Sequence, residues 1–177
     1  MREGLIDGRR AAVIAAAILG VALCEQEAFG APPQGGGETA ERMSARALVA
    51  NASERAATKL RRPECQEVLS DFRDAGGRRL SLVLEDRGLS ANAFLASLVF
   101  VDGRATPLCA TGRAAAGANP GSVFIGVCKE TFARIAREDP GLAANAIIHE
   151  MLHALGLGEN PPTSEEITRQ VVKRCGF

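Results

Sequence analysis

The sequence has no Trp and no Tyr, and its 177 residues include only two His. Trp and Tyr are the side chains that most often stack on bases, anchor interfaces or donate a phenolic proton. Net charge is also lacking, because 21 Lys and Arg residues balance 21 Asp and Glu residues. Binding to a nucleic acid or to an anionic membrane surface needs an excess of positive charge, which this composition does not supply. We therefore expect no nucleic-acid partner and no chemistry that needs a phenol.

The N-terminal residues have the pattern of an export signal. Arg9 and Arg10 precede an apolar run over residues 11–23, and small residues flank a cleavage site at 28–30. The apolar run is shorter than the roughly 20 residues that span a bilayer. We predict a signal peptide over residues 1–30, a flexible tether over 31–37 and a single domain over 38–177. No stable membrane insertion is expected once the signal is removed.

The cysteines agree with an exported protein, either secreted or periplasmic. A lipid anchor on Cys24 is the less favoured alternative, because bulky Leu23 stands where such sites need a small residue. Removal of the signal peptide leaves an even number of cysteines, which predicts two disulfides in an oxidising compartment. These are Cys65, Cys109, Cys128 and Cys175. The sequence leaves all three of their pairings open.

Hydrophobic periodicity and capping residues predict a mixed α+β fold with a small sheet. A short helix is opened by Pro63 and ended by Gly76 and Gly77. A long loop is expected between the strands that end at 101 and begin at 122. The other predicted helices cover residues 39–60, 90–98, 129–137, 140–155 and 163–174, and the predicted strands cover 80–84, 98–101 and 122–127.

His149 and His153, the only histidines of the chain, lie four residues apart in the predicted helix 140–155. Residues at this spacing lie on one face of a helix, one turn apart. Their imidazole nitrogens can therefore bind one Zn²⁺ ion, at about 2.0–2.1 Å. Glu150 is displaced by about 100° around the helix axis, beside the metal, where a carboxylate can take a proton from a zinc-bound water. The pattern predicts a zinc site with Glu150 as general base.

The segment from His149 to Glu159, with the sequence HEMLHALGLGE, resembles the extended zinc-binding motif of the metzincin clan of metallopeptidases. In that clan a glycine follows the second histidine by three residues, and the third ligand follows it by six. Gly156 and Glu159 occupy these positions, although the clan's usual third ligand is His. The clan's methionine turn is absent, because no Met follows Met151. The resemblance implies a zincin-like domain, with a small sheet packed on several helices and an active-site helix at 140–155.

Glu165 and Glu166 are alternative third ligands, since the gluzincins complete their site with a glutamate on a following helix. Glu166 is also expected to form a capping box with Thr163 at the start of the last helix. The oxyanion of a hydrolytic reaction would be stabilised by Arg169, Lys173, a backbone N–H group or the metal itself.

The motif and the export signal together predict a secreted zinc-dependent hydrolase. We expect a metallopeptidase that cleaves peptide or protein substrates with a zinc-activated water and Glu150 as general base. Two alternatives remain open at this stage. One is a structural zinc module without catalysis, and the other is an exported interaction domain held together by disulfides, without a metal.

Overall fold

The computed structural model describes residues 36–176, which belong to one compact unit. The predicted signal peptide, Cys24 and the tether up to residue 35 lie outside the described residues. The helices are α1 (Gly36–Lys59), α2 (Pro63–Gln66), α3 (Val68–Asp71), α4 (Leu80–Asp86), α5 (Ala91–Ala96), α6 (Pro107–Ala110), α7 (Lys129–Glu138), α8 (Pro140–Ala154) and α9 (Ser164–Cys175). The strands are β1 (Val99–Asp102), β2 (Ala116–Ala118) and β3 (Phe124–Val127). The mixed α+β composition confirms the general fold class.

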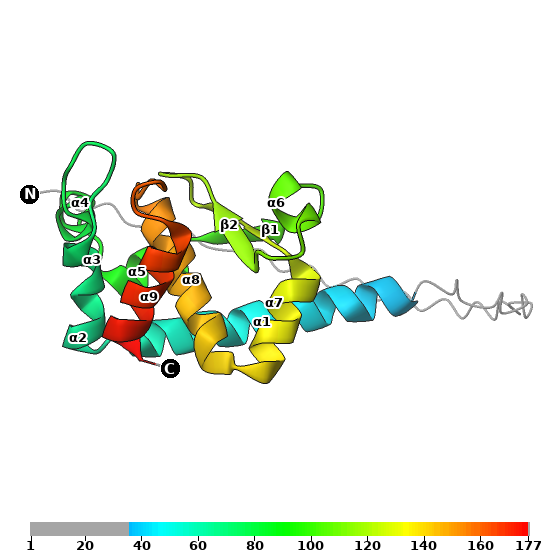
Figure 1. Cartoon of the computed structure of the whole chain (residues 1–177). Coiled ribbons are helices and arrows are strands. Elements are labelled where there is room, and N and C mark those ends of the chain that lie inside the picture. Colours follow the sequence, from blue (N-terminus) through cyan, green and yellow to red (C-terminus); the bar gives the residue numbers. More distant parts are fainter. Residues whose placement is uncertain (1–35, 177) are drawn as a thin grey trace, which may run out of the picture. The chain divides into compact units, whose positions relative to one another are not determined.

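Helix α8 is the centre of the fold, and it contacts α1, α7, α9 and the sheet (Figure 1). Ile147, Ile148, Met151 and Leu152 have no exposed surface. A helix that is apolar on nearly every side is stable only when other elements surround it, which is the position that α8 occupies. No helix within residues 36–176 has the length and the apolar character needed to cross a membrane.

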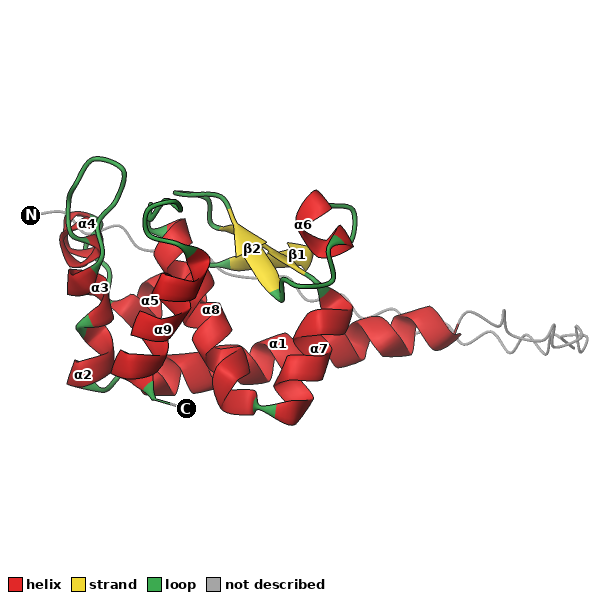
Figure 2. Ribbon diagram, viewed as in Figure 1, coloured by secondary structure: helices red, strands yellow, loops and turns green. Residues whose placement is uncertain are grey.

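The sheet has three strands in the order β1-β3-β2, and Figure 2 shows it as the small yellow element among the helices. Strand β1 pairs with β3 in parallel, and β2 pairs with β3 in antiparallel orientation. Ile125 and Val127 of β3 are buried toward the core. Val99 and Phe124, which face each other in the register, are exposed by 42% and 58% on the other face. The sheet therefore packs on the helices with one face only.

The prediction of a strand over residues 80–84 is wrong, because this segment belongs to helix α4. Leu80, Val83 and Leu84 are its buried residues, a spacing that matches one face of a helix. Leu82, which a strand would place on the same face as Leu80 and Leu84, is 47% exposed. A short apolar run is compatible with the two-residue period of a strand and with the 3.6-residue period of a helix. Packing of α4 against α3 selects the helix.

The predicted long loop between the two main strands contains two further elements, α6 and β2. Strand β2 has the sequence Ala-Gly-Ala, which has little intrinsic preference for a strand. Its pairing with β3 and its packing on α8 define it instead. Gly117 of β2 leaves room for Leu108 of α6, whose Cδ2 lies 2.1 Å from where a Cβ atom on that glycine would be. Such tertiary contacts are not visible in local sequence patterns.

Two disulfides are present, as the cysteine count predicts. Cys65 pairs with Cys175, which ties α2 to the last residue of α9. Cys109 pairs with Cys128, which ties α6 to the residue before α7. The sequence left this pairing open, and the positions of α2 and α6 decide it. Disulfides of this kind are typical of proteins that fold in oxidising compartments outside the cytosol.

Candidate metal centre

The helix that carries the motif begins and ends where the sequence predicts. The side chain of Asp139 accepts a hydrogen bond from the backbone N–H of Leu142 at 2.9 Å, and Pro140 occupies the first turn. At the other end Leu155 is the C-cap, and Gly156 follows with a φ of 114°. This left-handed backbone angle is one that glycine adopts without strain. The two caps fix where the helix begins and ends, and its packing in the core fixes the directions of its side chains.

Both histidines of α8 point to one place, where Glu159 joins them. The Nε2 atoms of His149 and His153 are 3.1 Å apart, and Glu159 Oε1 lies 3.3 Å from His153 Nε2 and 4.0 Å from His149 Nε2. Ligand atoms at about 2.0–2.1 Å from a tetrahedral zinc ion are about 3.3–3.4 Å from one another. The three side chains could therefore bind a metal ion with small adjustments of Glu159.

The site is closed by the core on one side and open to solvent on the other. His149 and His153 are 6% and 4% exposed, whereas the Glu159 side chain is 43% exposed. Zinc sites that keep three protein ligands and an accessible fourth position are typical of catalysis, while structural sites have four protein ligands.

The second ring nitrogen of each histidine has a hydrogen-bond partner of its own. His153 Nδ1 lies 2.8 Å from the carbonyl oxygen of Leu157, and His149 Nδ1 lies 3.0 Å from the hydroxyl of Thr168 in α9. Such outer contacts fix the ring orientation of metal-binding histidines and direct Nε2 at the ion. Sequence reasoning missed both partners: Leu157 acts through its backbone, and Thr168 lies on another helix.

Glu159 reaches the histidines because the chain reverses directly after α8. Gly156 makes the turn, and the backbone N–H of Leu157 donates to the carbonyl of Leu152 at 3.1 Å. Leu157 is 2% exposed, so the returning chain is anchored in the core. Asn160, directly after Glu159, has a φ of 64° and donates its N–H to the Pro162 carbonyl at 2.8 Å. The loop beyond α8 is thus held at both ends.

Glu150 lies beside the cluster and is almost completely buried, with 7% of its surface exposed. One of its oxygens accepts a hydrogen bond from the backbone N–H of Ala118 in β2. The other, Oε2, has no hydrogen-bond partner within residues 36–176. Burial, helped by the nearby carboxylate of Glu159, raises the pKa of Glu150 to about 8, against the effect of the Ala118 bond. At this pKa the carboxyl is largely protonated at neutral pH, and a cation bound beside it would favour the carboxylate form that a general base needs.

The electrostatic surroundings keep His149 neutral. Burial lowers the pKa of its imidazole to about 4, and the neighbouring His153 ring adds to this effect. The ring is thus uncharged at neutral pH, which is the protonation state in which histidine binds metals.

The structure brings Glu159 to the histidines and leaves the two alternative glutamates elsewhere. Glu166 Oε2 accepts hydrogen bonds from the N–H and the hydroxyl of Thr163 at 2.8 and 3.1 Å, in the predicted capping box. Glu165 is exposed in the first turn of α9. The two cations considered for an oxyanion interact with acidic groups outside the cluster: Arg169 with Glu166, and Lys173 with Asp71 of α3.

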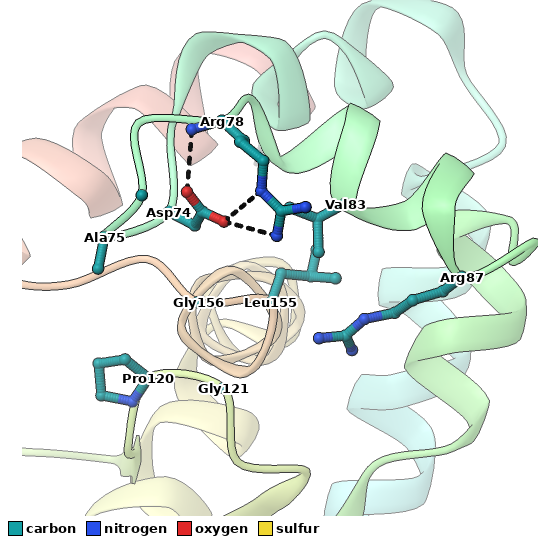
Figure 3. A pocket seen from close by; sticks show the side chains of 10 residues that line it. Asp74, Ala75, Arg78, Val83, Arg87, Pro120, Gly121, Leu155 and Gly156 are labelled. Atoms are coloured by element: carbon teal, nitrogen blue, oxygen red, sulfur yellow. Dashed lines mark hydrogen bonds and ion pairs between the residues drawn. The ribbon is translucent and has the colours of Figure 1, made fainter.

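A pocket of about 280 Å³ adjoins the turn that follows α8 (Figure 3). Leu155 and Gly156 form part of its wall, together with Gly121, whose N–H donates to the carbonyl of His153 at 2.9 Å. In Figure 3 the Arg87 guanidinium points toward the end of α8. At the top of the view, the Arg78 side chain donates a hydrogen bond to the Asp74 carboxylate. The end of the helix that carries both histidines is therefore accessible from outside.

Comparison with known proteins gives no match: no family model, curated protein or solved structure is similar to this chain. The functional interpretation therefore depends on the geometry of the cluster itself.

Proposed function

We propose that this protein is an exported zinc-dependent hydrolase, and specifically a metallopeptidase of the zincin class. The observation that carries the proposal is the convergence of His149, His153 and Glu159, whose ligand atoms all lie within 4.8 Å of one another. Two imidazoles and one carboxylate are a donor set that zinc prefers, and three protein ligands leave a position for water or substrate.

The hydrogen bonds of the histidines support a metal site over an accidental cluster. The Leu157 carbonyl can only accept, so His153 carries its proton on Nδ1 and directs the lone pair of Nε2 toward His149 and Glu159. His149, His153 and Glu159 would hold the ion. A zinc ion bound there acts as a Lewis acid and lowers the pKa of a water molecule towards 7.

Glu150 is proposed as the general base that moves the proton. The Ala118 N–H holds one carboxylate oxygen in place, and Oε2 is free to take a proton from the attacking water. The same oxygen then delivers that proton to the leaving nitrogen as the peptide bond breaks. Burial of Glu150 excludes bulk water from this transfer.

The position of β2 favours an extended peptide as substrate. Strand β2 lies at the edge of the sheet, and its Ala118 contacts Glu150 through the backbone. An edge strand offers unpaired backbone groups to which a peptide can add as a further strand. A peptide bound there would pass beside the general base.

Replacement of Glu150 by Gln tests the proposal. Glu150→Gln keeps the size and the Ala118 hydrogen bond but cannot accept a proton, so zinc should remain bound while peptide cleavage falls by about 10²–10⁴-fold. Zinc content and cleavage of a mixed peptide library are measured on the mature protein. Glu165→Gln is the matched control, because Glu165 is an exposed glutamate of α9, and it should cleave like the wild type. Wild-type protein that binds no zinc, or a Glu150→Gln variant that cleaves at the wild-type rate, would contradict the proposal.

A further inference from the structure

The pocket of about 280 Å³ beside the end of α8 is built from four separate parts of the chain. The turn 74–78, helix α4, the loop after β2 and the end of α8 each contribute to its wall (Figure 3). Two glycines of this wall connect it with the candidate metal centre. The N–H groups of Gly121 and Gly156 both donate to the carbonyl oxygen of His153, at 2.9 and 2.8 Å. The pocket therefore adjoins the backbone of a residue that carries one of the two imidazoles.

The side of the pocket formed by α4 and α8 is apolar. Val83 and Leu155 line it and are 4% and 2% exposed, so side chains of the core form this wall. Pro120 adds a further apolar surface. Ligand pockets typically combine apolar walls with a few polar groups, and the polar groups determine orientation and specificity. The charged residues of the wall therefore decide which ligand fits.

Two of the three charged residues that line the pocket neutralise each other. Asp74 accepts hydrogen bonds from the side chain of Arg78 at 3.0 and 3.1 Å, and from its backbone N–H at 2.9 Å. Arg78 also forms an ion pair at 3.0 Å with Asp86, which does not line the pocket. The turn 74–78 therefore contributes no unbalanced charge to the pocket.

Arg87, the third charged residue, contributes a positive charge that no carboxylate balances. It is the C-cap residue of α4, and in Figure 3 its side chain extends toward the end of α8. Its guanidinium lies over the ring of Phe94, 5.1 Å from the ring centroid. Within residues 36–176 no Asp or Glu forms an ion pair with it. A guanidinium can bind a carboxylate through two parallel N–H donors, so a carboxylate is the group that this pocket lacks.

We propose that this pocket binds a carboxylate of the peptide substrate, and that Arg87 is the residue that determines this specificity. The inference rests on the proposed peptidase function and adds the substrate class. The carboxylate belongs to an acidic side chain or to the C-terminus of the peptide. Either source presents the same charged group next to apolar atoms, which fit the wall formed by Val83 and Leu155.

The order of the residues along the chain supports a peptide as the ligand. Strand β2 ends at Ala118, whose N–H binds Glu150, and Pro120 and Gly121 of the pocket follow directly. A peptide that pairs with β2 and passes Glu150 therefore continues toward the pocket. Ala118 and Gly121 are three residues apart, a distance of at most about 10–11 Å along the chain. The carboxylate should accordingly lie within about three residues of the bond that is cleaved.

Cleavage of paired peptides tests the specificity and identifies the source of the carboxylate. In the first set the C-terminus is amidated, and each position within three residues of the central bond carries either Glu or Gln. In the second set acidic residues are absent, and the C-terminus is either free or amidated. We expect one of the two sets to show a preference for the carboxylate of about 10–100-fold in kcat/KM.

Two variants and one control test the role of Arg87. Arg87→Gln removes the charge and should make the two members of each pair equal substrates. Arg87→Lys keeps a positive charge without the planar fork of donors and should retain part of the preference. Arg134→Gln is the matched control, because Arg134 is an exposed arginine of α7 that does not line the pocket. It should show the preference of the wild type.

A binding measurement separates this inference from the proposed function, because it needs no cleavage. The probes are N-acetylglutamate α-amide and N-acetylleucine, whose carboxylates represent the two sources, and the comparison compounds are the corresponding uncharged amides. We expect one probe to give saturable NMR shifts of the Gly121 and Gly156 amides in the wild type and no shifts in Arg87→Gln. The uncharged compounds should give none.

The possible results lead to different conclusions. Probe binding that depends on Arg87, in a protein that binds zinc but cleaves no peptide, contradicts the proposed function and supports the carboxylate site. Peptide cleavage without a preference in either set, or a preference that persists in Arg87→Gln, contradicts the role of Arg87 alone. Absence of shifts with both probes, or equal shifts with the uncharged compounds, also contradicts the carboxylate site.

Discussion

The two sides of the candidate metal centre are built differently. The helical side, formed by α8 and α9, holds both histidines in the core, at 6% and 4% exposure. The sheet side is formed by the edge strand β2 and its neighbour β3. Only one face of this sheet is covered by helices, and the outer face exposes Val99, Val101 and Phe124. Strand β2 consists of Ala and Gly alone.

This difference agrees with the proposed function. Ligand atoms must be held within a few tenths of an ångström, which requires packed helices and hydrogen-bonded rings. A surface that admits a peptide must leave backbone groups accessible, and small side chains do so. The helical side is therefore expected to tolerate change less well than the sheet side.

The two disulfides give the largest expected difference between the sides. The disulfide between Cys65 and Cys175 fastens the end of α9, on the helical side, and closes a loop of 110 residues that also includes the sheet. Cys109 and Cys128 close a loop of 19 residues beside the sheet. Loop-closure entropy predicts that removing the first pair by substitution with Ala lowers the free energy of unfolding by about 5 kcal/mol, and the second by about 3 kcal/mol. Denaturant titration of both double variants measures this, and a greater loss for the sheet disulfide would break the comparison.

Glycines on the two sides give the next difference. Ala at Gly156 would have a φ of 114° and place its Cβ 3.2 Å from Cβ of Asp74. We expect Gly156→Ala to cost about 1–3 kcal/mol and to weaken zinc binding, because the turn also positions Glu159. In Gly117→Ala the new Cβ meets only the end of the Leu108 side chain, which can rotate, so the cost should be smaller.

Gly158→Ala is the control for the loop itself, since a Cβ there meets nothing within 4 Å. It should bind zinc like the wild type. Equal zinc affinities for Gly156→Ala and Gly158→Ala would show that the turn at Gly156 does not contribute to zinc binding.

The smallest expected effect concerns the ion pair that fastens α9 to α3. Hydrogen bonding from Arg174 holds the pKa of Asp71 below its ordinary value, and burial opposes this only in part. A carboxyl with a lowered folded-state pKa stabilises the protein above its unfolded pKa of about 3.8, and this stabilisation is lost as the pH falls through the folded pKa. Asp71→Asn should therefore lower the melting temperature slightly at pH 7 and not at all in strong acid. A difference that grows on acidification would contradict this sign.

The sequence was sufficient to predict the helix of the candidate site and the common direction of its two histidines. The spacing of His149 and His153, the Asp139 cap and the Gly156 turn are local features, and local features determine one helix and the reversal after it. Glu159 was suggested by the resemblance to the metzincin motif, with Glu165 and Glu166 left open, and the structure brings Glu159 to the histidines.

The partners contributed by other elements were not predictable. Thr168 and Ala118 reach the site from α9 and β2, through contacts that depend on the tertiary fold. The prediction of a strand at 80–84 was wrong for a related reason. A short apolar run is compatible with the period of a strand and with that of a helix, and packing against neighbouring elements decides between them. Strand β2 carries no local strand signal and exists through its pairing with β3.

Zinc-edge X-ray absorption spectroscopy of the zinc-loaded protein tests the central claim most directly. The account predicts one zinc ion per chain, bound by two imidazole nitrogens and by oxygen ligands at about 2.0–2.2 Å. The imidazole signal should be halved in His153→Ala. A zinc ion with one imidazole ligand or none in the wild type, or a chain that retains no zinc, would contradict the account.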